Sequence, residues 1–141
     1  MMMAGGKDVF FEVESQGEPM GGSHEDLQVW QKAMDMVVAV YQLTEEFPKR
    51  EMYGLTGQMR SCAASVPANI AEGRARQGPA EFRRFLYIAA GSVAELETFL
   101  ELSRRLRYAS AEQIRLVRCM VEEVGRMLYG LIRAVGERIA T

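Results

Sequence analysis

Acidic side chains that could hold metal ions gather in one helical stretch of this 141-residue chain. Glu95, Glu97 and Glu101 stand where a carboxylate-bridged di-metal centre of a helical bundle could be built. Such a centre also needs Glu-x-x-His pairs, and the single histidine, His24, lies far away in the sequence. The pattern therefore predicts no metal and no cofactor. Arginines that follow at helical spacing favour a solvated, salt-bridged face instead.

Nucleophilic catalysis is not indicated either. Cys62 and Cys119 have no nearby histidine that could form a thiolate pair, and no serine has a base at a suitable spacing. Phosphate-binding loops of the GxxxxGK[ST] or GxGxxG type do not occur in the sequence. We therefore predict that the protein is not an enzyme. The wide spacing of the cysteines favours buried thiols in a reducing, cytoplasmic environment over a disulfide.

Basic residues form two local clusters, although the chain as a whole has a net charge of −2. Residues 49–86 have a local net charge of +4, and residues 104–118 have the same excess. Arginine dominates both clusters, and its planar guanidinium suits bidentate contact with phosphate. The predicted nucleic-acid-binding residues are Lys49, Arg50, Arg74, Arg76, Arg83, Arg84, Arg104, Arg105 and Arg107. The alternative is that these arginines stabilise helix C-termini and pair with glutamates.

Aromatic residues bear on this choice, because proteins that bind single strands interleave stacking platforms with arginine. Tyr53 near Arg50 and Tyr108 beside Arg107 are the candidates in this sequence, and they make a weak signal.

A small polar group interrupts an otherwise apolar helix after Pro67. Pro67 leaves a carbonyl one turn earlier without its donor, and the Asn69 side chain could supply one. We predict that Asn69, Glu72 and Gly73 form a satisfied structural knot, because buried polar groups are normally paired. A ligand site is the alternative.

Hydrophobic periodicity places these residues on helices that begin near Ser23, Gly54, Pro79 and Ser110. Short links between them predict an all-α, up-down-up-down antiparallel four-helix bundle over residues 24–141. Residues 1–23 are expected to be a flexible, acidic, glycine-rich tail, and no apolar run is long enough to span a membrane. The expected core stripes are Leu27, Trp30, Met34, Val37 and Tyr41; Leu55, Met59, Cys62, Val66 and Ile70; Phe82, Leu86, Ala89, Val93, Leu96 and Leu100; and Ile114, Val117, Val121, Val124, Leu128, Leu131 and Val135.

The third helix carries a second apolar stripe, formed by Phe85, Phe99, Leu102 and Leu106. One bundle of this size has little room for both stripes, and exposed apolar patches mark interfaces. We therefore predict a homo-oligomer with these four residues in its contact.

Several blocks of the sequence match a known pattern. They are Phe47-Pro48, the turn at 51–58, SVPANIAEG at 65–73 and EFRRFLYIAAGSVAE at 81–95, within a longer similarity over 24–136. Together they resemble the four-helix-bundle proteins encoded in intervening sequences of bacterial large-subunit ribosomal RNA genes. That family is similar to the accessory variability determinant of diversity-generating retroelements.

The resemblance implies a homopentamer with a central channel and no catalytic activity. For the retroelement relatives it implies a basic ring that engages nucleic acid and a reverse transcriptase. The chain departs from the family pattern at Ala75 and Ala90, where Gly and Arg are usual, so no role of an arginine at position 90 carries over. Two hypotheses follow: a non-enzymatic accessory protein that binds RNA or DNA, or a structural assembly module that binds only a protein partner.

Overall fold

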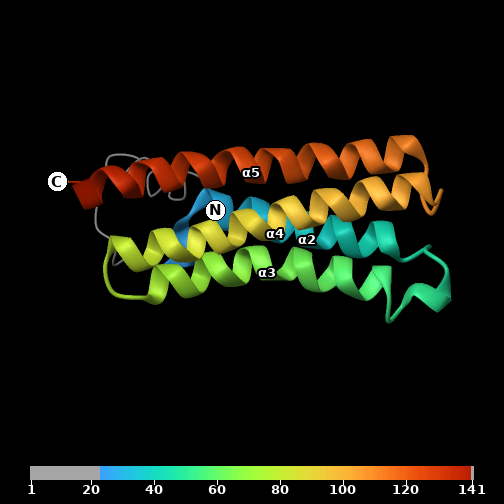
Figure 1. Cartoon of the computed structure of the whole chain (residues 1–141), viewed down its shortest axis with the longest axis horizontal. Helices are drawn as coiled ribbons and strands as arrows, with labels where there is room; N and C mark the ends of the chain where they lie inside the picture. The colour runs from blue at the N-terminus through green and yellow to red at the C-terminus, as the bar shows by residue number, and fades with distance from the viewer. Residues whose placement is uncertain (1–22, 141) are drawn as a thin grey trace, which may run out of the picture.

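The computed structural model describes residues 23–140, so nearly all of the predicted tail lies outside the described residues. Four long helices alternate in direction along the bundle, and α2 and α4 each pack against both α3 and α5 (Figure 1). No strand occurs within the described part, and the predicted up-down-up-down all-α bundle is confirmed. The elements are η1 (His24–Asp26), α2 (Gln28–Thr44), η2 (Lys49–Glu51), α3 (Leu55–Ala75), α4 (Pro79–Arg105) and α5 (Ala111–Ala140).

The helix ends follow from local capping. The Ser23 side chain accepts a hydrogen bond from the Glu25 N–H and so caps the short turn η1, which means that the first long helix begins later than expected, at Gln28. At the start of α5, the Ser110 N–H donates to Gln113 Oε1 at 3.0 Å and the Gln113 N–H donates to Ser110 Oγ at 3.1 Å. This reciprocal pair is a capping box, which fixes where α5 begins.

The core contains the predicted stripes of α3 and α4 in full. On α5 one position differs, since Ile132 is buried and Leu131 only partly so. On α2 the prediction was wrong for Met34 and Tyr41, which are exposed. Two apolar stripes on α2 have the same spacing, and sequence periodicity cannot tell which faces inward. The buried stripe of α2 is Val29, Ala33, Met36, Val40 and Leu43.

The predicted oligomer contact divides between the core and the surface. Phe85 is buried within the subunit and Phe99 packs partly buried against the core, whereas Leu102 and Leu106 are 42% and 45% exposed. The prediction for Phe85 is therefore wrong, because this ring already has cover from its own chain. Despite the remaining apolar surface, no helix within residues 23–140 combines the length and hydrophobicity that a bilayer span needs.

Candidate nucleic-acid interface

A hydrogen-bonded latch joins the α2–α3 connection to the α4–α5 turn. Glu51 Oε1 accepts from the Leu55 N–H at 2.9 Å, and Glu51 Oε2 accepts from the Tyr108 hydroxyl at 2.7 Å. The Tyr108 ring packs against Phe47, with centroids 5.3 Å apart. The Leu55 N–H and then the Tyr108 hydroxyl lower the pKa of Glu51, and the bond to Glu51 raises the pKa of Tyr108. Segments that are 57 residues apart in sequence are thereby held together.

The loop after η2 is folded tightly around two glycines. A Cβ at Gly54 would come within 2.6 Å of Glu51 Oε1, and one at Gly57 within 2.7 Å of the Met52 carbonyl oxygen. The Met52 carbonyl is backbone, so position 57 needs the close approach that only glycine allows, whereas at position 54 the atom in the way is the end of the Glu51 side chain. The result is a fixed loop that leaves the Tyr53 side chain 98% exposed.

The latch brings five of the predicted basic residues to one end of the bundle. This basic end comprises Lys49 and Arg50 in η2 and Arg104, Arg105 and Arg107 at the end of α4, at the right of Figure 1. All five side chains are exposed. Among the residues described, Lys49, Arg50 and Arg107 take part in no ion pair.

Glu101 is the main counter-charge at the basic end. It accepts hydrogen bonds from Arg104 at 2.7 Å, Arg105 at 2.9 Å and Arg118 at 3.1 Å, and these contacts hold its pKa well below the usual range. The predicted salt-bridged face is confirmed for Glu101. The five cations of the basic end and Arg118 outnumber Glu101 and Glu51, the carboxylates that contact or adjoin them, which leaves this surface with an excess of positive charge.

Arg107 occupies a backbone conformation that usually belongs to glycine, with φ at 60°. The Arg107 N–H donates to the Arg104 carbonyl and the Tyr108 N–H donates to the Ser103 carbonyl, which is the hydrogen-bond pattern of a Schellman helix end. An L-residue with a side chain is strained there by about 1 kcal/mol or more. The geometry turns the chain sharply and aims the Arg107 side chain at solvent.

At the opposite end of the bundle, the α3–α4 turn, arginines lie against aromatic rings. Arg74 is only 5% exposed, with its guanidinium 5.7 Å from the Phe82 ring centroid. Arg76 and Arg84 lie over the Phe85 ring at 5.0 Å and 4.5 Å. The prediction that Arg74 binds nucleic acid was wrong, because its side chain is packed inside the subunit.

Local contacts hold the remaining arginines of that turn as well. Arg76, the residue that follows α3, pairs with Glu72 at 2.8 Å, and Arg84 pairs with Glu81 within α4 at 3.2 Å. The Arg83 side chain extends to α5 and lies beside Gly136. A Cβ added at Gly136 would be 3.0 Å from Arg83 Nη1. The alternative interpretation, in which arginines pair with glutamates, describes Arg76 and Arg84.

The predicted polar knot does not form. Asn69 Nδ2 donates to the Ser65 carbonyl at 2.8 Å, which is one turn back from Asn69 itself and is not the carbonyl that Pro67 leaves without a donor. Glu72 is exposed and bound to arginine, while Gly73 is buried where a Cβ would lie 2.6 Å from the Phe85 Cβ. These residues serve separate roles, and that of Gly73 is the close packing of α3 on α4.

A polar seam lies nearby between α3 and α4. The Cys62 thiol donates to the Ser92 carbonyl at 3.0 Å, and the Ser65 and Ser92 hydroxyls are hydrogen-bonded at 2.6 Å. Burial, with Glu95 close by, raises the pKa of Cys62 to about 12, so this thiol is not a nucleophile at neutral pH. Cys119 is exposed, so the expectation of a buried thiol was wrong for it.

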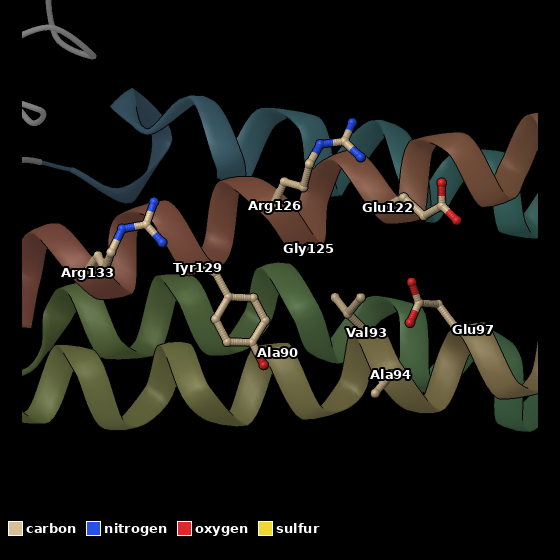
Figure 2. A pocket seen from close by; sticks show the side chains of 9 residues that line it. All are labelled: Ala90, Val93, Ala94, Glu97, Glu122, Gly125, Arg126, Tyr129 and Arg133. Atoms are coloured by element: carbon tan, nitrogen blue, oxygen red, sulfur yellow. The ribbon is translucent and has the colours of Figure 1, made fainter.

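An open groove of about 540 Å³ runs along the surface where α4 packs against α5 (Figure 2). Its floor is made of small residues, including Ala90 and Gly125, and the carboxylates of Glu97 and Glu122 point toward each other across it. Nowhere in residues 23–140 do three or more His, Cys, Asp or Glu side chains gather as a metal ion would require. Glu97 is half-buried and Glu122 exposed, and the groove lining adds no third carboxylate, histidine or cysteine beside them.

Comparison with known proteins relates this arrangement to a family. No curated protein matches the chain. A solved structure that is similar is that of a protein with unknown function from the S23 ribosomal protein family of Bacteroides thetaiotaomicron. The two chains are 26% identical, the match covers 74% of this chain and 95% of that one, and the TM-score is 0.68. The family model described as 23S rRNA-intervening sequence protein matches residues 25–130, and the chain therefore belongs to this family.

Proposed function

We propose that this protein is a non-enzymatic, homo-oligomeric subunit that binds the phosphates of RNA or DNA through its basic end. The observation that carries the proposal is the latched, exposed group of Lys49, Arg50 and Arg107, none of which has an ion-pair partner among the described residues. Phosphate contacts from such residues supply affinity that does not depend on base sequence.

The paired arginines of the basic end contribute to the same surface. Arg104 and Arg105 are exposed, and exposed ion pairs stabilise a protein little, so their bonds to Glu101 exchange readily for bonds to phosphate. One subunit still offers few charges. A ring of subunits repeats the basic end and raises the affinity for a polyanion without any new contact.

Exposed apolar side chains support assembly of such a ring. Leu102 and Leu106 on α4 and Met34, Val38 and Tyr41 on α2 are all exposed on the single subunit. Two separate apolar faces suit a head-to-tail contact, in which one face meets a different face of the next subunit. Five subunits follow from the family resemblance alone. Light scattering tests the assembly, and Leu102→Glu should reduce the mass while helicity is kept.

A salt-dependent gel shift tests the binding. The probe is a structured RNA with single-stranded flanks, and the wild type should shift it at about 50 mM salt and release it at about 200 mM. The double variant Lys49→Ala, Arg107→Ala should lower the slope of log affinity against log salt by about 2 for each subunit that contacts the RNA. Arg76→Ala with Arg84→Ala, at the other end, is the matched control and should change the slope less. An intact assembly that gives no shift at low salt refutes the proposal.

The second candidate is an assembly module that binds only a protein partner in the cytoplasm. The exposed apolar stripe of α2 favours it, because such stripes mark protein contacts. From the sequence resemblance of the family to the retroelement accessory determinant alone, a reverse transcriptase is the partner to test first. Co-purification with a reverse transcriptase encoded beside this gene, together with absence of any RNA shift, would favour this candidate.

A further inference from the structure

The fully exposed Tyr53 ring is unusual for a residue in a rigid loop. An aromatic ring contributes to stability mainly through burial, and Tyr53 at 98% exposure contributes almost nothing of that kind. The backbone that carries it is nevertheless held in place, because Glu51 is bonded to both Leu55 and Tyr108 and because Gly57 packs closely against the Met52 carbonyl. The loop thus presents the aromatic ring to solvent. A ligand that stacks on this ring loses little entropy, because the loop is already ordered before binding.

The groove beside Tyr53 differs in chemistry from the basic end. Tyr53 and Met52 line an open groove of about 610 Å³ between α3 and α4, whose walls also carry Gln58, Ser61 and Glu95. No Lys or Arg is among its lining residues in the described chain, so the groove offers hydrogen-bonding groups and one carboxylate but no site for a phosphate. A neutral, planar group with polar edges fits these walls better than an anion.

The two surfaces meet along five consecutive residues. Lys49 and Arg50 precede Tyr53 by four and three positions, and Arg50 lies close enough to Glu51 and Tyr108 to influence the charge of both. Exposed cations that lie close in sequence to an exposed ring are a combination found in proteins that bind single strands, with phosphates on the cations and bases on the ring. In a duplex the bases are already stacked and cannot reach the ring.

We propose that Tyr53 is a base-stacking platform and that the basic end therefore binds unpaired nucleotides in preference to duplex. The phosphates contact Lys49 and Arg50, one base stacks on Tyr53, and its polar edge faces the α3–α4 groove. This inference rests on the proposed nucleic-acid function and narrows it to one structural class of ligand.

Fluorescence anisotropy of the full chain tests the inference with a labelled 12-nucleotide single-stranded RNA and a duplex of the same length. Tyr53→Ala should weaken single-strand binding by about tenfold, as the loss of one stacked base does, and leave duplex binding unchanged. Tyr53→Phe should bind like the wild type, because stacking does not need the hydroxyl. Tyr87→Ala, which removes another exposed tyrosine on α4, is the matched control and should have no effect.

A spectroscopic signal supplies a second, independent measurement. With 2-aminopurine in the single strand, the wild type should quench its emission on binding and Tyr53→Ala should not. If Tyr53→Ala binds each probe as tightly as the wild type does, the inference fails and the proposed function stands. If the wild type binds neither probe, both fail. A fall in the mass measured by light scattering for Tyr53→Ala would assign the ring to a subunit contact and overturn the inference.

Discussion

The two ends of this bundle carry similar numbers of arginines and pair some of them with nearby glutamates, but they differ in whether aromatic rings cover the guanidinium groups. At the α3–α4 turn the guanidinium groups of Arg76 and Arg84 lie on the Phe85 ring, and the positive φ of 86° belongs to Gly78. At the basic end no aromatic ring covers the arginines in the described chain, and the positive φ belongs to Arg107. A local charge excess is therefore not in itself a binding surface. What matters is whether the cations have protein to lie against.

The largest expected effect is on the free energy of unfolding, which a substitution should change much more at one end than at the other. Phe85→Ala removes a buried ring that packs beside Gly73 and under two arginines, and should lower the free energy of unfolding by about 3–5 kcal/mol. Tyr53→Ala, at the other end, should change it by less than about 0.5 kcal/mol, because the ring is exposed. Urea denaturation followed by circular dichroism measures both. Similar losses from the two variants would contradict the contrast.

Sequence reasoning reached the fold because periodicity and breakers are local signals. The core stripes of α3 and α4 and the start of α5 at the Ser110–Gln113 capping box follow from residues close together in the chain. The inward face of α2 did not follow, because its two apolar stripes have equal spacing. Only packing against α3 and α5 decides between them.

The candidate site was predicted only in outline. Both clusters of basic residues were identified, but the burial of Arg74 depends on a ring presented by the next helix. Glu51 was missed as the centre of the latch, because its partner Tyr108 is distant in sequence. Tyr108 itself, a candidate stacking residue, is instead the anchor of that latch. Tyr53 was also a candidate, and its exposure became visible only with the folded loop.

Arg107 tests whether strain at the basic end is linked to binding. Arg107→Gly relieves the positive φ and should raise the free energy of unfolding by about 1 kcal/mol, since glycine is the usual residue at this position of a helix end. The same variant loses one cation, so the slope of log affinity against log salt for RNA should fall by about 1. Arg107→Ala is the control that loses the charge and keeps the strain. A glycine variant that is less stable than the wild type would contradict the account.

Acidification should remove more folding stability at the basic end than at the opposite end. The pKa of Glu101 is depressed in the folded state by three arginines, and that of Glu81 by Arg84 first, so both carboxylates stabilise the fold above their unfolded pKa. That contribution is lost as the pH falls from about 4.5 through the folded pKa. Glu101→Gln should therefore flatten the decline in stability on acidification more than Glu81→Gln does. The measurement is urea denaturation between pH 6 and pH 3, and equal slopes for the two variants would remove the distinction.

The smallest expected effect comes from removing the hydrogen bond between Tyr108 and Glu51 in the latch. Tyr108→Phe keeps the ring on Phe47 and removes only the hydroxyl that donates to Glu51 Oε2, which should lower the free energy of unfolding only slightly. Since Glu51 also accepts from the Leu55 N–H, its side chain stays in place but becomes freer to move. Hydrogen exchange should accordingly become faster in the loop around residue 53 and stay unchanged at the α3–α4 turn. Tyr129→Phe, which alters a tyrosine at the α4–α5 groove, is the matched control. If exchange in the loop is the same in Tyr108→Phe as in the wild type, glycine packing alone fixes Tyr53 and the hydroxyl bond adds nothing to its placement.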